Sequence, residues 1–186
     1  VDIAQWAIGM DASGPATVEA AKAELPVPLS HGMPTRADSY NTVTHFDVRC
    51  RFPNGVELVI TSTGENGITF EGEHGTFFVN RGKLTGPAVD DLKSHPLPED
   101  AIIKLRKGKK PSSHMANFFA CCRDRSQPVS DVFSHHRALT TCHLANIAIR
   151  LGRKLTWDAA TEQIVGDAEA NGFLKREQRK GFETHA

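Results

Sequence analysis

The sequence has no long apolar run, no excess of either charge and no cationic-then-apolar start. Its longest apolar stretches fall far short of the roughly 20 residues that cross a bilayer, so no membrane partner is expected. Lys plus Arg and Asp plus Glu both number 22, which gives no long-range electrostatic reason to expect nucleic acid. A neutral small molecule or another protein is the expected partner.

Several motifs of catalytic sites are also missing. There is no Gly-x-Gly-x-x-Gly turn for a dinucleotide phosphate, no Gly-x-Ser-x-Gly nucleophile and no Cys-x-x-Cys pair. No complete active site can be read from this chain, so no catalytic residue is assigned. The spacing of the cysteines suits neither a disulfide framework nor zinc, and all four are expected to be free, buried thiols: Cys50, Cys121, Cys122 and Cys142.

A length of 186 residues suits one compact unit with its own core. The first residue is Val1, and a helical spacing of apolar residues starts at once with Ile3, Trp6 and Ala7. We therefore expect residue 1 to be a cut in a longer polypeptide. A cytoplasmic location is favoured, and a targeting signal upstream of the cut is left open.

The clearest local pattern predicts a β-hairpin from Phe46 to Ile60. Apolar residues at 46, 48, 50 and 52 alternate with polar ones before Asn54-Gly55, and the period of two resumes from Val56. Further turns separate short apolar segments at 68–70 and 76–79, which predicts an antiparallel meander.

Two other segments of the first half are less regular. Residues 17–25 are a candidate strand, whereas residues 26–40 are too rich in Pro, Gly and polar residues for regular structure. Because binding groups often sit on a loop held against a rigid sheet, the loop 26–40 is a candidate functional surface.

The second half changes to a helical period. One amphipathic helix, with Met115, Phe118, Phe119 and Cys122 as its stripe, is expected to end near Asp124. Ser130 is predicted to cap a longer helix that ends at Gly152. The stripe of this second helix is Ala138, Leu139, Cys142, Ala145 and Ile149. Strands followed by helices indicate an α+β fold, with a largely antiparallel open-faced sheet and helices packed on one face.

The C-terminal part is predicted to return as an extended segment at 154–157, followed by a short helix at 167–174. The charged tail from Lys175 is expected to be loose.

Two charged clusters have simpler interpretations than a binding site. His136 and His143 lie two helical turns apart and His114 could approach them, but this spacing lacks the one-turn pair and carboxylate usual for zinc, so no metal is predicted. The basic run 104–110 is broken by Gly108 and has no interleaved aromatics, which favours a solvated loop.

Three passages carry the most distinctive residues: 1–9 (VDIAQWAIG), 114–119 (HMANFF) with 123–125 (RDR), and 142–148 (CHLANIA) through 151–158 (LGRKLTWD). They resemble the second half of bacterial oxidoreductases of the glucose-fructose oxidoreductase / inositol dehydrogenase family. The resemblance spans nearly the whole chain and is weakest in loops 26–40 and 86–111.

The resemblance implies hydride transfer between a sugar or polyol and NAD or NADP, with a His and a Lys handling the hydroxyl proton. The Lys belongs to an N-terminal dinucleotide-binding (Rossmann) half. The His lies three residues before Asp2, upstream of Val1. The whole of 1–186 is then the substrate-binding and oligomerisation domain. Alone, it is expected to be inactive and to hold no cofactor.

Candidate substrate-binding residues are Asp2, Arg36 and Tyr40, with His31 behind them. A competing function is a non-enzymatic interaction module that uses its exposed sheet face. Both functions predict an apolar outer face, because Phe77 and Phe78 must point to opposite sides of their strand and Val59 repeats this pattern on the hairpin. We expect a homo-oligomer through that face.

Overall fold

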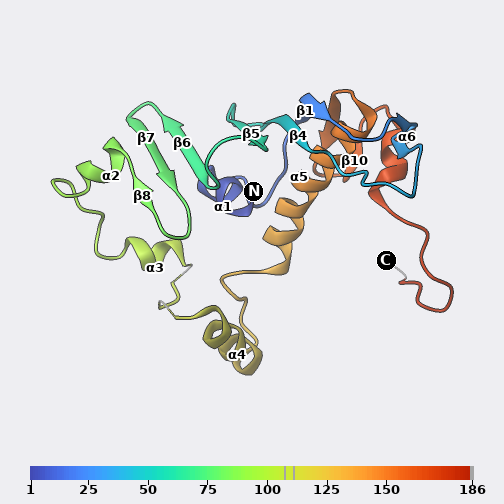
Figure 1. The fold of residues 1–186 in the computed structure, drawn as a ribbon. Coiled ribbons are helices and arrows are strands. Elements are labelled where there is room, and N and C mark those ends of the chain that lie inside the picture. Colours follow the sequence, from blue (N-terminus) through green and yellow to red (C-terminus); the bar gives the residue numbers. More distant parts are fainter. Residues whose placement is uncertain (107, 111, 185–186) are drawn as a thin grey trace. The chain divides into compact units, whose positions relative to one another are not determined.

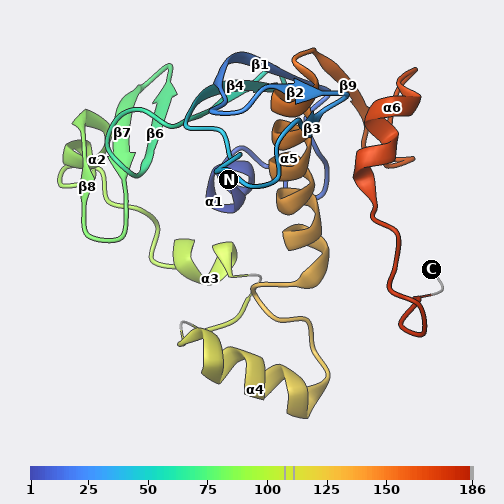
Figure 2. The same cartoon turned by 45° about the vertical axis from the view of Figure 1, so that its right-hand side comes forward.

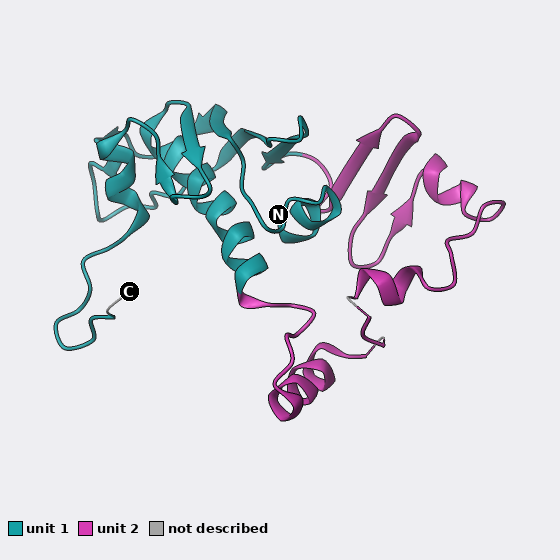
Figure 3. Ribbon diagram, turned by 180° about the vertical axis from the view of Figure 1, so that it is seen from behind, with its two compact units in different colours: residues 1–63, 133–186 teal, residues 64–132 magenta. Residues whose placement is uncertain are grey.

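The computed structural model describes residues 1–106, 108–110 and 112–184 (Figure 1). The chain divides into two compact units: residues 1–63 with 133–184 form the first, and the described residues of 64–132 form the second (Figure 3). This differs from the single compact unit expected from the length, because the strands of residues 64–132 pair only with one another.

The first unit is built on a five-stranded antiparallel sheet with the order β10-β9-β1-β4-β5. Its strands are β1 (Thr17–Glu24), β4 (His45–Arg51), β5 (Glu57–Thr61), β9 (Leu155–Asp158) and β10 (Gln163–Ile164). The predicted hairpin is confirmed by β4 and β5, which pair with Cys50 opposite Leu58. Gly55 has a φ of 86° in the connecting turn, a conformation that glycine adopts without a Cβ penalty. The strand candidates at 17–25 and 154–157 are confirmed by β1 and β9.

One face of this sheet carries the core. Val18, Val48 and Leu155 point inward and are at most 1% exposed, and α5 (Val132–Leu151) places Leu144 and Ala148 against them. Figure 2 shows α5 lying beneath the sheet. Full burial of a side chain such as Leu144 contributes roughly 1.5–3 kcal/mol, so this contact stabilises the unit. The α+β architecture with helices on one sheet face is therefore confirmed.

The buried stripe of α5 is only partly the predicted one. Ala138, Ala145 and Ile149 are buried as expected, whereas Leu139 is 56% exposed and Cys142 is exposed. The helix faces the sheet through a stripe rotated by about one position from the prediction, and this stripe consists of Ala138, Thr141, Leu144, Ala145, Ile147, Ala148 and Ile149. The helix ends at Leu151, and Gly152 follows with a φ of 63°, as predicted.

Helix α1 (Asp2–Ala7) is attached to α5 by a buried glutamine. The side chain of Gln5 donates to the carbonyl oxygens of Met10 and Ser13, at 2.9 Å each, and accepts a hydrogen bond from the Thr141 hydroxyl. Every polar atom of the Gln5 amide is thus engaged in a fully buried position, which holds the start of the chain against the long helix.

The loop 26–40 contains a small hairpin that the sequence did not predict. Strands β2 (Leu29–Ser30) and β3 (Met33–Pro34) pair across a turn of His31 and Gly32, with φ values of 48° and 69°. Two successive left-handed residues form the primed type of turn that matches strand twist. The pattern escaped detection because each strand has two residues and His31 is an uncommon residue for this conformation.

The C-terminal segment packs as predicted, with α6 (Ala168–Asn171) followed by the 3-10 turn η1 (Gly172–Leu174). The Asp167 carboxylate accepts from the backbone N–H of Ala170 and caps α6. Arg153 donates to both oxygens of Asp167 and to Glu169, and it thereby joins α6 to the end of α5.

The second unit contains the predicted meander as a separate three-stranded antiparallel sheet: β6 (Ile68–Gly72), β7 (Gly75–Val79) and β8 (Leu84–Thr85). Phe70 and Phe77 stack across β6 and β7 with ring centroids 4.8 Å apart. Helices α2 (Pro87–Asp91), α3 (Ala101–Leu105) and α4 (His114–Asp124) follow. The predicted helix at α4 is confirmed, and its cap Ser113 accepts from the Ala116 N–H. Its apolar stripe is exposed, however, with Met115, Phe118 and Phe119 all more than half accessible.

The expected apolar outer face of the first sheet is wrong. Val59 is paired with Arg49 and lies among charged residues, and Arg51 Nε is 3.0 Å from the Glu57 carboxylate on the same face. Phe77 and Phe78 belong to the other sheet, so they are not part of the outer face of this one. The alternation of apolar and polar residues showed which side chains of the β4–β5 hairpin share a face. It carried no information on which strands pair with which.

Candidate functional site

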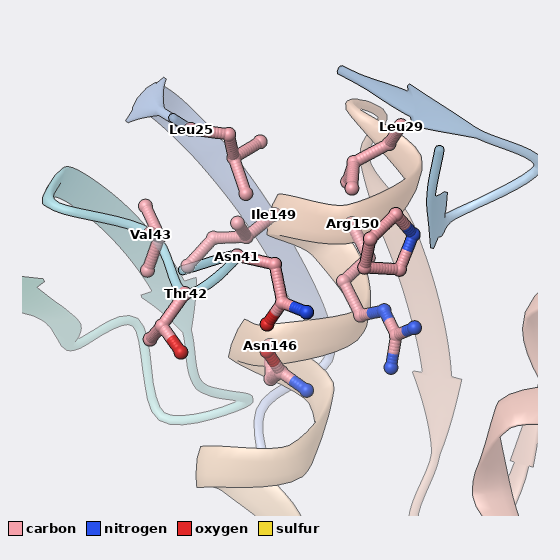
Figure 4. A pocket seen from close by; sticks show the side chains of 9 residues that line it. Leu25, Leu29, Asn41, Thr42, Val43, Asn146, Ile149 and Arg150 are labelled. Atoms are coloured by element: carbon pink, nitrogen blue, oxygen red, sulfur yellow. The ribbon is translucent and has the colours of Figure 1, made fainter. Parts of the chain in front are cut away.

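A pocket of about 310 Å³ lies in the first unit between α5 and the chain that leaves β1 and returns to β4. Figure 4 shows its walls. The lining residues are Leu25, Leu29, Pro34, Asn41, Thr42, Val43, Asn146, Ile149 and Arg150. The β2–β3 hairpin contributes Leu29 and Pro34, so the segment predicted as a functional loop does form one side of the pocket.

One part of the pocket is an apolar wall. Leu25, Leu29 and Val43 face Ile149, whose side chain is 7% exposed and continues into the core beneath the sheet. Because that wall is continuous with the core, its shape is set by packing rather than by the loop alone.

The polar groups gather on the other side of the pocket. Figure 4 shows the amides of Asn41 and Asn146 near each other, with the Arg150 guanidinium on the same side, away from Leu25 and Leu29. Asn146 and Arg150 are four residues apart on α5, a spacing that puts both on one face of a helix. Thr42 adds a hydroxyl from the returning loop. The pocket therefore combines hydrogen-bonding groups with an apolar surface.

Arg150 also holds the hairpin in place. Its Nε donates to the Gly32 carbonyl oxygen at 2.6 Å, Nη2 lies 3.0 Å from Met33 Sδ, and the guanidinium stacks 4.9 Å from the Phe173 ring centroid. On the outside of the turn, His31 Nδ1 is 3.1 Å from the Glu169 carboxylate. These contacts hold the hairpin tip against α5 and α6.

A second and more open depression of about 530 Å³ shares Leu25, Leu29, Ile149 and Arg150 with the pocket. The rest of its lining is apolar or backbone, including Pro26, Val27 and Pro28. It offers fewer side-chain hydrogen-bonding groups than the first pocket.

The four predicted site residues are not brought together. Asp2 begins α1 with its carboxylate 3.9 Å from the terminal amine, Arg36 Nε lies 3.4 Å from Asp38, and Tyr40 is 68% exposed. His31 is paired with Glu169. No hydrogen bond or ion pair joins any two of the four, all of which lie in the described part of the chain, and none of them lines either depression.

Sequence reasoning missed Asn41, Asn146 and Arg150. Asn41 directly follows the predicted Tyr40, and both α5 residues lie in a correctly predicted helix. Polar residues beside a predicted apolar stripe resemble an ordinary solvated helix face, so only their i, i+4 spacing next to the irregular loop was a usable signal.

The thiols are free, but only Cys50 and Cys121 are buried, which corrects the expectation for Cys122 and Cys142. Burial in the core raises the pKa of Cys50 to about 12. Partial burial also raises the pKa of Cys142, and the Asp2 carboxylate adds to this effect while the terminal amine opposes it. Neither thiol is therefore prepared as a nucleophile at neutral pH.

The charged clusters have ordinary partners. His136 pairs with Glu162 at 3.0 Å, and within the described ranges no three His, Cys, Asp or Glu residues are arranged to hold a metal. In the basic run, Lys104 pairs with Asp100 at 2.8 Å and Lys109 Nζ lies 2.7 Å from the Ser126 hydroxyl. Lys107 lies outside the described residues. None of the described helices is long and apolar enough to cross a membrane.

The pocket does not fit a dinucleotide. Phosphates bind where helix N-termini and glycine-rich turns present free N–H groups, whereas this pocket borders the last turns of α5, where the unpaired groups are carbonyls. Its lining contains no carboxylate for a ribose diol. The arrangement suits a small polar molecule instead.

The family model described as "Oxidoreductase family, C-terminal alpha/beta domain" matches residues 2–184. The chain therefore belongs to this family, which is the glucose-fructose oxidoreductase / inositol dehydrogenase family, as its C-terminal domain. Comparisons with curated proteins and with solved structures gave no match.

Proposed function

We propose that this chain is the substrate-binding half of an oxidoreductase that transfers hydride between a sugar or polyol and NAD or NADP. The nicotinamide would be bound by a dinucleotide-binding (Rossmann) domain of the same polypeptide. Membership of the oxidoreductase family supports the reaction class, and the pocket between the 25–43 segment and α5 is the observation that carries the substrate class.

Polyols require a particular kind of site. Each hydroxyl both donates and accepts, and the amides of Asn41 and Asn146 provide both functions in adjacent positions. The C–H faces of a sugar need apolar contact, which Leu25, Leu29 and Ile149 provide. A polar pocket with one apolar wall therefore orients a polyhydroxylated molecule.

The role of the chain would be to bind and orient the substrate. The cofactor, when bound to its own domain, supplies hydride chemistry. Asp2 lies at the start of α1, and its charge raises the pKa of Cys142 on α5. In the joined polypeptide it would lie near the residues that precede α1. His31, Arg36 and Tyr40 flank the pocket-lining residues of the 25–43 segment and remain proposed contacts for the outer part of the substrate. We expect the chain alone to be inactive and to bind no cofactor tightly.

Activity of the joined polypeptide tests this function. The chain is expressed behind a dinucleotide-binding half of its own family, and NADH and NADPH formation is measured against a panel of sugars and polyols. Substitution of Asn41→Ala or Asn146→Ala should lower kcat/KM about tenfold, because one hydrogen bond to substrate contributes about 1 kcal/mol or slightly more. Full activity in both variants, or no oxidation of any polyol, would contradict the proposal.

The second candidate function is an interaction module that binds a partner through the open sheet face. The charges on this face change the kind of partner that it could bind. Arg49, Arg51 and Glu57 are ion-paired on the open face, so a partner must be charged and complementary rather than apolar. A second copy of the chain, presenting the same alternation of charges, meets that requirement, and we retain the homo-oligomer as a proposal. Light scattering with Arg51→Glu against the unmodified chain decides it: a complex that dissociates supports the proposal, and a chain that is monomeric throughout contradicts it.

A further inference from the structure

Arg150 is the one charged side chain among the residues that line the pocket. Among the residues that the structure describes, no acidic one lines the pocket or the neighbouring depression. The ligand-facing surface therefore carries a net positive charge from a single guanidinium.

This guanidinium has no carboxylate partner in the described part of the chain. Its neighbours are the Gly32 carbonyl oxygen, the Met33 sulfur and the Phe173 ring, all of them neutral. The other arginines of the same region are paired, since Arg137 contacts Glu162 and Arg153 contacts both Asp167 and Glu169. Arg150 differs from them although all three surround the same helix and its C-terminal turn.

Arg150 is half-buried, and its place in the pocket wall without a counterion leaves its charge able to attract an anion. The terminal carbonyls of α5 offset part of the charge. A charge-assisted hydrogen bond to a ligand is stronger than this offset, so an anionic ligand can still bind. The side chain is already oriented for one, because the Gly32 carbonyl fixes Nε and the Phe173 ring supports one face of the guanidinium.

The geometry favours a carboxylate over a phosphate. With Nε engaged, the Nη edge remains, and two parallel N–H groups match the two oxygens of a carboxylate. A phosphate dianion carries more charge and needs more donors, whereas the pocket adds only Asn and Thr side chains and lies beside helix carbonyls that repel additional negative charge.

We infer that Arg150 selects a polyol that bears a carboxylate, such as an aldonic or uronic acid, with Asn41 and Asn146 contacting its hydroxyls. The inference rests on the proposed function, because it names the substrate class of the same pocket. It assigns to Arg150 a specificity-determining role in addition to holding the β2–β3 hairpin.

Matched ligands test it by NMR titration of the full 186-residue chain. D-gluconate is compared with D-glucitol, and D-glucuronate with its methyl ester, so that each pair differs in the carboxylate. We expect each acid to bind at least tenfold more tightly than its neutral counterpart. Arg150→Gln should remove this difference between acid and neutral ligand, and Arg150→Lys should retain part of it.

A control separates recognition from a structural role. Arg153→Gln breaks the ion pairs to Asp167 and Glu169 but changes no pocket-lining residue, so it should keep the preference for the acid. Thermal unfolding of each variant shows whether folding is retained. Equal binding of acid and neutral ligands, an Arg150→Gln variant that keeps the preference, or stronger binding of glucitol 6-phosphate overturns the inference.

Acetate that competes as well as gluconate also overturns it, because this result means that the pocket binds an adventitious ion only. Failure of the proposed function is recognised separately, since it appears as an absence of polyol oxidation in the joined polypeptide. Binding of neutral and acidic polyols with equal affinity leaves that function standing while it removes the role given to Arg150.

Discussion

The Thr141 hydroxyl donates a 2.8 Å hydrogen bond to Oε1 of Gln5, and both side chains are fully buried. The bond joins residues 136 positions apart and fastens α1 to the middle of α5. This buried polar pair therefore fixes α1 against the middle of α5.

Replacement of Thr141 by Val should destabilise the first unit by about 1–3 kcal/mol, because the Gln5 oxygen loses its partner in a dry position. Urea unfolding followed by tryptophan fluorescence measures the change, since Trp6 and Trp157 both lie in this unit. Thr140→Val is the matched control, because its hydroxyl donates to the His136 carbonyl oxygen of its own helix. Equal losses of unfolding free energy in the two variants would show that the hydrogen bond to Gln5 does not stabilise the unit.

Substitution of Gly32 should loosen the wall of the pocket. A Cβ at this position would lie 2.8 Å from Phe173 Cζ and 3.0 Å from Leu151 Cδ2, in a backbone with a φ of 69°. We expect Gly32→Ala to weaken polyol binding as well as stability, because Leu29 and Pro34 belong to the same hairpin.

Gly9→Ala provides the comparison for Gly32→Ala. Gly9 has the same φ of 69° but nothing within 4 Å of an added Cβ, so this variant carries the backbone cost alone, about 1 kcal/mol. Calorimetry of both variants tests the claim. If Gly32→Ala is no worse than Gly9→Ala in stability and binds ligand normally, the hairpin does not shape the pocket.

The stability of the first unit should fall at alkaline pH through Cys50. Burial raises the pKa of this thiol from 9.0 to about 12, so the folded state holds the proton more tightly than the unfolded chain does. The contribution is fully present below the unfolded pKa and is lost as pH rises through the folded value. Unfolding free energy, measured across this window, should therefore decline less in Cys50→Val, and parallel curves for the two proteins would refute the assignment.

Acid should weaken the contact between α5 and α6. The Arg153 guanidinium lowers the pKa of both Asp167 and Glu169, so the stabilisation is present above their unfolded values, 3.8 and 4.5, and is lost as pH falls through the lower folded values. Arg153→Gln should be less stable than the unmodified chain at neutral pH, with a difference that narrows in strong acid. Arg36→Gln, at a more exposed pair, serves as the control.

The local elements of the fold could largely be predicted. Alternation through Phe46 and Phe52 marks a strand because one sheet face is buried and the other is open, and Gly152 marks a helix end because it adopts a positive φ. The division into two sheets could not, because strand pairing depends on contacts distant in sequence, such as Val18 with Leu155. Nothing in the local pattern of Val59 or Phe77 shows that they belong to different sheets.

The loop 26–40 that the sequence singled out contributes Leu29 and Pro34 to the candidate pocket. Its side chains at 31, 36 and 40 point to other partners or to solvent, and the other groups that line the pocket come from flanking residues and α5. Arg150 and Asn146 come to line a pocket because the β2–β3 hairpin folds back over the helix. This is a tertiary relationship that helical spacing alone does not contain.

The central claim is that the pocket between α5 and the 25–43 segment binds the polyol, and the side-chain amide resonances of Asn41 and Asn146 test it most directly. Titration of the ¹⁵N-labelled chain with a sugar acid should shift these two NH₂ pairs together, with the same dissociation constant and ahead of other side-chain amides. Asn54, on the β4–β5 turn and engaged with the Ile8 carbonyl, should not respond. If Asn54 shifts while Asn41 and Asn146 stay unchanged at saturation, the substrate binds elsewhere and the account is wrong.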